Sequence, residues 1–131
     1  MMGAEPVWIE EFDVRVLHER LLAIHGGLAG VRDEGLLNSA VARPRQIANY
    51  EPNADMIDLA SAYTVGLVKN HPFIDGNKRT GFVVGVLFLE MNGYRFTAPE
   101  ADAADAVLAL AAGILDERGY TAFLRKNAER A

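Results

Sequence analysis

The 131-residue sequence lacks cysteine altogether and has only five prolines. Without cysteine it can form neither a disulfide framework nor a thiolate metal site, so we expect a cytoplasmic protein. Long apolar runs are also missing. The longest, residues 81–89, has about half of the ~20 residues that a membrane span needs, and the first ten residues lack the basic flank of a secretory signal. These absences predict a protein with no membrane association.

A positive overall charge is absent too. The net charge is −5, whereas a protein that binds nucleic acid directly usually presents a broad basic surface. We therefore expect no direct binding of nucleic acid. With 50% hydrophobic residues the chain can build one substantial core, so we expect residues 1–131 to form a single domain. The exception to the acidic balance is a small basic cluster made by Lys69, His71, Lys78 and Arg79.

Apolar residues recur at helical spacing along most of the chain, which predicts an all-α fold, a compact helical bundle. We expect a first helix that ends at Gly26 and a second that begins after Asp33 and stops before Pro44. The apolar stretch 57–70 and the run that follows residue 77 both predict buried central helices.

The remaining elements are expected to be short. Pro6 to Ile9 has the composition of an edge strand, and Tyr94 to Thr97 that of a brief extended piece after Gly93. Thr97-Ala-Pro-Glu100 has the form of a capping box that opens a helix through Leu110. A last helix is predicted from about Asp116.

The segment His71-Pro-Phe-Ile-Asp-Gly-Asn-Lys-Arg-Thr80 carries the chemically informative residues. Asn77 is predicted to cap the following helix, which places Lys78 and Arg79 in its first turn. Two cations there are unfavourable, because the free amides already make that end of a helix positive. A bound polyanion would remove the conflict, so the pattern indicates a phosphate site.

The other residues of the segment suit the same chemistry. His71 has the ordinary pKa best suited to removing a proton from a hydroxyl near neutral pH, so it is the candidate catalytic base. Asp75 is the candidate metal ligand, for the Mg²⁺ that accompanies ATP. The candidate phosphate-binding residues are Gly76, Asn77, Lys78 and Arg79.

This segment resembles the signature of the Fic/Doc family, His-x-Phe-x-Asp/Glu-Gly/Ala-Asn-x-Arg, at every fixed position. Residues 25–33 and 37–44 resemble the upstream region of the death-on-curing (Doc) branch, and residues 88–94 resemble its segment after the motif. The likeness covers most of the chain from Leu17 to about Asn127. It implies a helical domain, with the active-site loop leading into a buried helix, that transfers part of a nucleotide to a hydroxyl of a protein.

The resemblance leaves two reactions open. Fic enzymes that transfer AMP usually have Gly-Asn-Gly-Arg-x-x-Arg, whereas this chain has Lys78 for the second glycine and Phe82 for the last arginine. The Asn-Lys-Arg-Thr sequence instead resembles the Doc branch, which implies a toxin that phosphorylates the translation factor EF-Tu and so blocks translation. Gly76 departs from that branch, where alanine is frequent. Because Lys78 and Phe82 both depart from the AMP-transfer motif, we favour phosphorylation and keep AMP transfer as the alternative.

The resemblance also implies a partner. Doc proteins are restrained by a small antitoxin, commonly of the Phd type, and this sequence lacks the inhibitory Ser/Thr-x-x-x-Glu-Gly/Asn string that many Fic proteins carry. Restraint by a separate antitoxin is therefore expected. A catalytically inert relative, acting only as a binding partner or co-repressor of its antitoxin, is the non-enzymatic alternative.

Other polar residues are given structural interpretations. His18 and His25 lack a third metal ligand at suitable spacing, so they are taken as ordinary helix residues. Gly26, Gly27 and Gly30 are expected to shape a mobile loop over the site, as the resemblance implies. Arg32 and Asp33 would lie at the substrate-facing edge or form a local ion pair or cap, and neither is a catalytic candidate.

Overall fold

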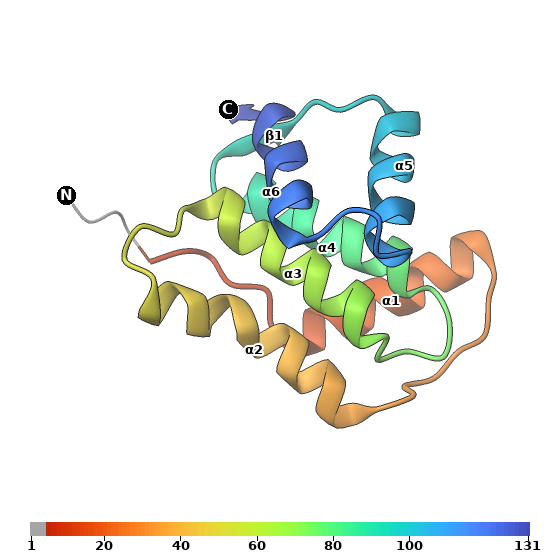
Figure 1. Cartoon of the computed structure of the whole chain (residues 1–131). Helices are drawn as coiled ribbons and strands as arrows, with labels where there is room; N and C mark the ends of the chain where they lie inside the picture. The colour runs from red at the N-terminus through yellow and green to blue at the C-terminus, as the bar shows by residue number, and fades with distance from the viewer. Residues whose placement is uncertain (1–4) are drawn as a thin grey trace.

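The protein is predominantly helical, which confirms the predicted all-α class. The computed structural model describes residues 5–131, which contain six helices and one two-stranded sheet (Figure 1). The helices are α1 (Glu11–His25), α2 (Glu34–Tyr50), α3 (Met56–Asn70), α4 (Asn77–Met91), α5 (Glu100–Ala111) and α6 (Glu117–Lys126). Strands β1 (Tyr94–Phe96) and β2 (Ala128–Arg130) pair antiparallel. No helix within this described part is long and apolar enough to cross a bilayer.

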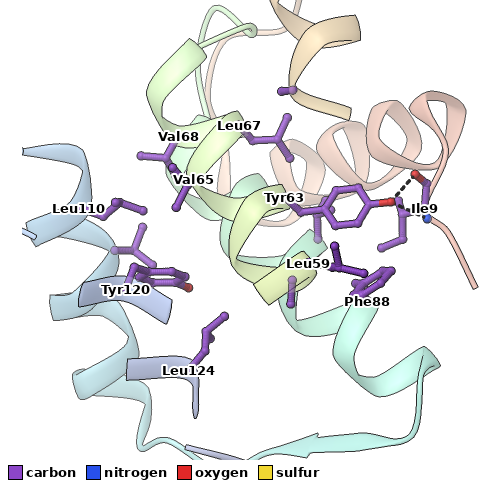
Figure 2. Close-up of a cluster of buried hydrophobic side chains, with 14 of the residues drawn as sticks. Ile9, Leu59, Tyr63, Val65, Leu67, Val68, Phe88, Leu110, Tyr120 and Leu124 are labelled. Carbon is purple, nitrogen blue, oxygen red and sulfur yellow. Dashed lines mark hydrogen bonds between the residues drawn. The ribbon is translucent and has the colours of Figure 1, made fainter. Parts of the chain in front are cut away.

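Helix α3 forms the centre of the fold. It packs most extensively against α4 and α2, and α6 lies along another of its sides (Figure 1). All of its residues from Leu59 to Val68 are buried, which is why the sequence is apolar all round. Its first turn is fixed by a reciprocal capping box between Asp55 and Asp58. Figure 2 shows side chains on both flanks of α3, with Tyr120 and Leu124 on one side and Phe88 on the other.

Helices α3 and α4 approach each other closely because α4 has glycine on the contact face. A Cβ on Gly85 would overlap Oγ1 of Thr64 and come within 3.0 Å of the carbonyl oxygen of Ala60. The same threonine donates a hydrogen bond to the carbonyl oxygen of Gly81 at 2.7 Å. The close contact of Gly81 and Gly85 with Thr64 of α3 thus fixes the position of α4 and of the loop that precedes it.

The N-terminal segment is held by side chains and does not form the predicted edge strand at Pro6 to Ile9. The hydroxyl of Tyr63 accepts from the Ile9 amide and donates to the Ile9 carbonyl, both at 3.0 Å (Figure 2). Burial raises the pKa of Tyr63 to about 12, so the hydroxyl stays protonated as a donor. Asn92 binds the amide and carbonyl of Val7 in a similar way. These side chains form the hydrogen bonds with the backbone of Val7 and Ile9 that a neighbouring β-strand would otherwise form.

Two predicted helix boundaries are wrong. Helix α2 does not stop before Pro44 but continues through it to Tyr50. Pro44 has no backbone N–H to donate, and its side chain is buried. Beyond it, Ile47 and Ala48 pack against the core. Burial of this extension of about two turns offsets the lost hydrogen bond.

The predicted capping box at Thr97 also fails. The N-cap of α5 is Pro99, with no side-chain cap, and the hydroxyl of Thr97 instead donates to the carbonyl of Asn127 at 3.0 Å. Thr97 directly follows β1, and its amide bonds the same carbonyl at 2.7 Å. The extended piece after Gly93 is confirmed as β1, whereas its partner β2 was not anticipated.

Candidate active site

The loop between α3 and α4 begins at the predicted base. His71 is the C-cap of α3 and has φ 53° and ψ 53°, the one positive φ of a non-glycine residue in the described chain. Left-handed backbone is uncommon outside glycine, although histidine adopts it more readily than most residues. Such conformations gather at functional sites when the surroundings hold them. The His71 side chain is exposed and lines a cavity, so its ring is accessible to a substrate.

Asn77 was predicted as the N-cap of α4, and this prediction is wrong. Gly76 takes that place in a left-handed conformation, with φ 81°, and Asn77 is the first helical residue. The Asn77 side chain is 3% exposed and both of its polar atoms bind Phe73, accepting from the amide and donating to the carbonyl at 2.9 Å each. The side chain therefore closes the loop, and only the Asn77 backbone amide remains to contact a phosphate.

Lys78 and Arg79 occupy the first turn of α4, as predicted. Both side chains are exposed and line the cavity, and this turn contains no acidic residue. Among residues 5–131 neither cation forms a salt bridge. Two cations beside free helix amides form an electropositive site suited to phosphate oxygens. Lys69, the other cation of the basic cluster, is exposed but does not line this cavity.

The carboxylate of Asp75 is fixed by backbone amides on both sides. Its oxygens accept from Leu28 at 3.0 Å and from Gly76 at 2.9 Å. These hydrogen bonds, from Leu28 first, hold the pKa of Asp75 below its ordinary value of 3.8, and the positive charge of Lys78 acts in the same direction. The group is thus ionised near neutral pH, with lone pairs left over for a cation.

The surroundings of Asp75 fit Mg²⁺ bound together with a nucleotide. Within the described residues no three acidic or histidine side chains gather into a metal-binding cluster. Mg²⁺ is commonly held by one or two carboxylates plus substrate phosphates, which matches a single carboxylate beside a phosphate site. A cage made only of protein ligands would need more donors than this part of the chain supplies.

A cavity of about 690 Å³ joins the predicted residues to an apolar wall. His71, Asp75 and the stretch 76–79 line one part of it, and residues of α4, β1, α5 and the connection between β1 and α5 line the rest. That second part is mostly apolar and comprises Phe82, Val86, Phe96, Ala98, Ala103, Ala104, Val107 and Leu108, with Glu100. A charged end and an apolar wall in one cavity suit a ligand that has both phosphates and an aromatic ring.

His18 contributes to the site in a way that the sequence analysis missed. It is 3% exposed on α1, its ring is stacked on Phe73, and its Nε2 lies 2.8 Å from the carbonyl oxygen of Asp75. The spacing carried a usable signal, since His18 follows the buried Val14 by one helical turn. His25, two turns further along the same helix, is exposed as an ordinary helix-end residue.

The segment 26–33 lies beside the active-site loop and is bonded to it (Figure 1). Val31 and Phe73 form an antiparallel bridge, and the amide of Ile74 donates to the carbonyl of Gly30 at 3.0 Å. Asp33 caps α2 by accepting from Leu36, which confirms the predicted cap. The Arg32 side chain turns to the end of α3, where it donates to the carbonyl oxygens of Asn70 and His71.

Comparison with known proteins identifies the family of this chain. Residues 8–89 match the profile described as the Fic/DOC family, a segment that includes every residue of the active-site loop. The chain belongs to the Fic/Doc family. It is 32% identical over 111 residues to "Protein kinase doc" of Escherichia phage P1, covering 84% of this chain and 86% of that protein. It is 40% identical over 74 residues to "Toxin Doc" of Mycolicibacterium smegmatis, covering 56% and 57% respectively. Both relatives indicate the Doc branch of the Fic/Doc family.

Proposed function

We propose that this Fic/Doc protein is the toxin of a toxin–antitoxin pair and acts as a protein kinase. It would transfer the γ-phosphate of ATP to a hydroxyl of a translation factor similar to EF-Tu, with ADP as the leaving group, and thereby block translation. The observation that carries the proposal is the cavity in which His71, Asp75 and the cationic first turn of α4 meet an apolar wall. The names of the two relatives, a protein kinase and a toxin, support the same reading.

The chemistry divides among a few residues. His71 accepts the proton of the attacking hydroxyl, because its exposed ring lines the cavity at the entrance to the loop. Lys78, Arg79 and the first amides of α4 hold the phosphates in line and stabilise the negative charge that develops on them. Asp75 would hold Mg²⁺, which neutralises charge on the phosphate oxygens when bound. Phosphoryl transfer depends mainly on positioning and electrostatics, so no covalent nucleophile is needed.

Transfer of the γ-phosphate is favoured over AMP transfer by two positions. Phe82, where the AMP-transfer motif has its last arginine, lies in the cavity wall and offers no charge. Lys78 replaces a glycine of that motif and supplies only a point charge, which does not restore the bidentate contact that the missing arginine would make. AMP transfer is the alternative that the same residues would support.

The decisive experiment uses ATP labelled at either the γ- or the α-phosphate, with Mg²⁺ and a bacterial lysate. Label from the γ-phosphate on a protein of EF-Tu size is expected, and label from the α-phosphate would instead indicate AMP transfer. His71→Ala and His71→Asn should abolish labelling, while Arg43→Ala, which removes an ion pair to Glu117 outside the cavity, should retain it. Asn is the better replacement, because it tolerates left-handed backbone. Labelling that persists in both His71 variants would overturn the proposal.

Restraint by a Phd-type antitoxin forms the second half of the proposal. Expression of the chain alone in a bacterial host should arrest growth, and co-expression of its antitoxin should restore it. The His71→Asn variant should leave growth normal while still binding the antitoxin. If this variant remained toxic, a binding or co-repressor role would replace the enzymatic one.

A further inference from the structure

Arg32 caps the C-terminal end of α3 from another part of the chain. Its Nε donates to the carbonyl oxygen of His71 at 2.7 Å, and its Nη2 donates to the carbonyl oxygen of Asn70 at 2.9 Å. The last carbonyls of a helix have no partner within it, and a cation is favoured beside them. The planar guanidinium suits this arrangement, because it presents two donors in a fixed geometry.

The backbone around Arg32 reinforces the same contact. The amides of Arg32 and Asp33 both donate to the carbonyl of Pro72, at 2.7 and 3.0 Å. Three consecutive carbonyls, those of Asn70, His71 and Pro72, are therefore held by two adjacent residues. His71, in its left-handed conformation, is the central one of the three.

We propose that Arg32 is a positioning residue that keeps the His71 imidazole directed into the active-site cavity. The inference rests on the proposed function, since it assumes that His71 is the base. Arg32 does not line the cavity, so it acts through the backbone of His71 without contacting the nucleotide. A left-handed residue at a helix end has a competing, more favourable backbone conformation. Removing the guanidinium allows residue 71 to relax and swing the imidazole away from the attacking hydroxyl.

The test compares Arg32→Ala and Arg32→Lys with Arg43→Ala as a matched control. Lysine keeps the charge at the helix end but cannot hold two carbonyls in the same fork. Arg43 also loses two hydrogen bonds when replaced, but its partner Glu117 is remote from the His71 loop in the sequence and does not line the cavity. The measurements are His71-dependent transfer of label from γ-labelled ATP to lysate protein, and the backbone ¹³C chemical shifts of residues 70–72.

Both Arg32 variants should lower kcat by about tenfold to 100-fold, the cost of a small misplacement of a reacting group, with KM for ATP changed less than about twofold. Their backbone shifts at residues 70–72 should move, while Arg43→Ala should match the wild type in both measurements. If Arg32→Ala does not fold, Arg32→Lys alone decides the question.

Unchanged shifts, a kcat within about threefold of wild type, or a loss confined to KM would overturn the positioning role. Full recovery of kcat by lysine would reduce the contact to a charge effect and also overturn it. Should the wild type show no His71-dependent transfer, the proposed function fails by itself. The backbone shifts would then still decide whether Arg32 holds residue 71.

Discussion

The ring of His18 lies flat against the ring of Phe73, with centroids 3.7 Å apart and planes inclined by 8°. The same imidazole reaches the carbonyl oxygen of Asp75 at 2.8 Å, so one buried side chain of α1 supports two residues of the active-site loop. Gly76 also lies close by, since a Cβ there would be 3.6 Å from the imidazole. Helix α1 therefore supports the loop that connects α3 to α4.

Replacing His18 by alanine should destabilise the protein and loosen the loop. The change removes a buried aromatic contact and a hydrogen bond, which together correspond to about 2–4 kcal/mol of the free energy of unfolding. His25→Ala is the matched control, because His25 ends the same helix but is exposed. Urea denaturation of both variants measures the difference, and equal midpoints would contradict the supporting role of His18.

Gly85→Ala should separate the two central helices. The added methyl group would overlap Thr64 and approach the carbonyl of Ala60, and overpacking of this kind costs about 1–3 kcal/mol. Gly35→Ala is the control, since Gly35 is also helical and its new methyl would lie 3.4 Å from an Asp33 oxygen, where it fits. We expect Tm to fall for Gly85→Ala and to hold or rise for Gly35→Ala, given the higher helix propensity of alanine. A Tm unchanged at Gly85 would show that α3 and α4 can move apart freely.

Lys78→Ala should weaken ATP binding. One charge-assisted hydrogen bond contributes roughly 1.5–3 kcal/mol, which corresponds to about a tenfold to 100-fold higher Kd. Lys126→Ala changes the net charge equally, but Lys126 is exposed in the last turn of α6 and does not line the cavity. Its Kd should stay within about twofold of wild type in calorimetric titration with Mg²⁺-ATP. Equal losses in both variants would mean that only the overall charge matters.

The anchoring of segment 26–33 to Asp75 should depend on pH in the acid range. Amides of Leu28 and Gly76 lower the pKa of the carboxyl from 3.8, so folding favours the ionised form. The stabilisation is complete above about 3.8 and is lost as pH falls through the lower folded pKa. In an NMR titration the Leu28 and Gly76 amide shifts should move together with a midpoint below 3.8, and Asp75→Asn should abolish that step. A midpoint above 3.8 would refute the assignment.

Helix positions were predictable where neighbouring residues determine them. The first helix ends at Gly26, Asp33 and Asp116 cap the helices that follow them, and the apolar stretch 57–70 is the central α3. The caps depend on interactions within one turn of the residue concerned, and the burial of α3 is signalled by its own apolar sequence. Local propensity therefore sufficed.

Prediction failed where distant partners outweigh a local rule. Pro44 is accommodated because the later residues of α2 bury apolar surface on the core. Thr97 gives its hydroxyl to Asn127, 30 residues away, in place of a helix amide. Strand β2 forms only by pairing with β1, so its own three residues do not predict a strand.

The candidate site follows the same division. The residues of the loop and of the first turn of α4 are consecutive, so the sequence motif could present them together. The contacts of His18 and Arg32 with the loop were not predicted, because their partners lie 57 and 38–39 residues away in the sequence. Asn77 was predicted as the N-cap of α4, but Gly76 takes that position, and the Asn77 side chain turns back to Phe73 and not to the helix amides.

The paired hydrogen bonds between Asn77 and Phe73 have a thermodynamic consequence for ligand capture. They fix the backbone conformation of residues 73–77 in the free protein. A nucleotide should therefore bind with little change in the conformation of this loop. Little ordering entropy would then oppose complex formation, and deuterium uptake across residues 73–77 should be slow in the free protein and nearly the same once ATP is bound.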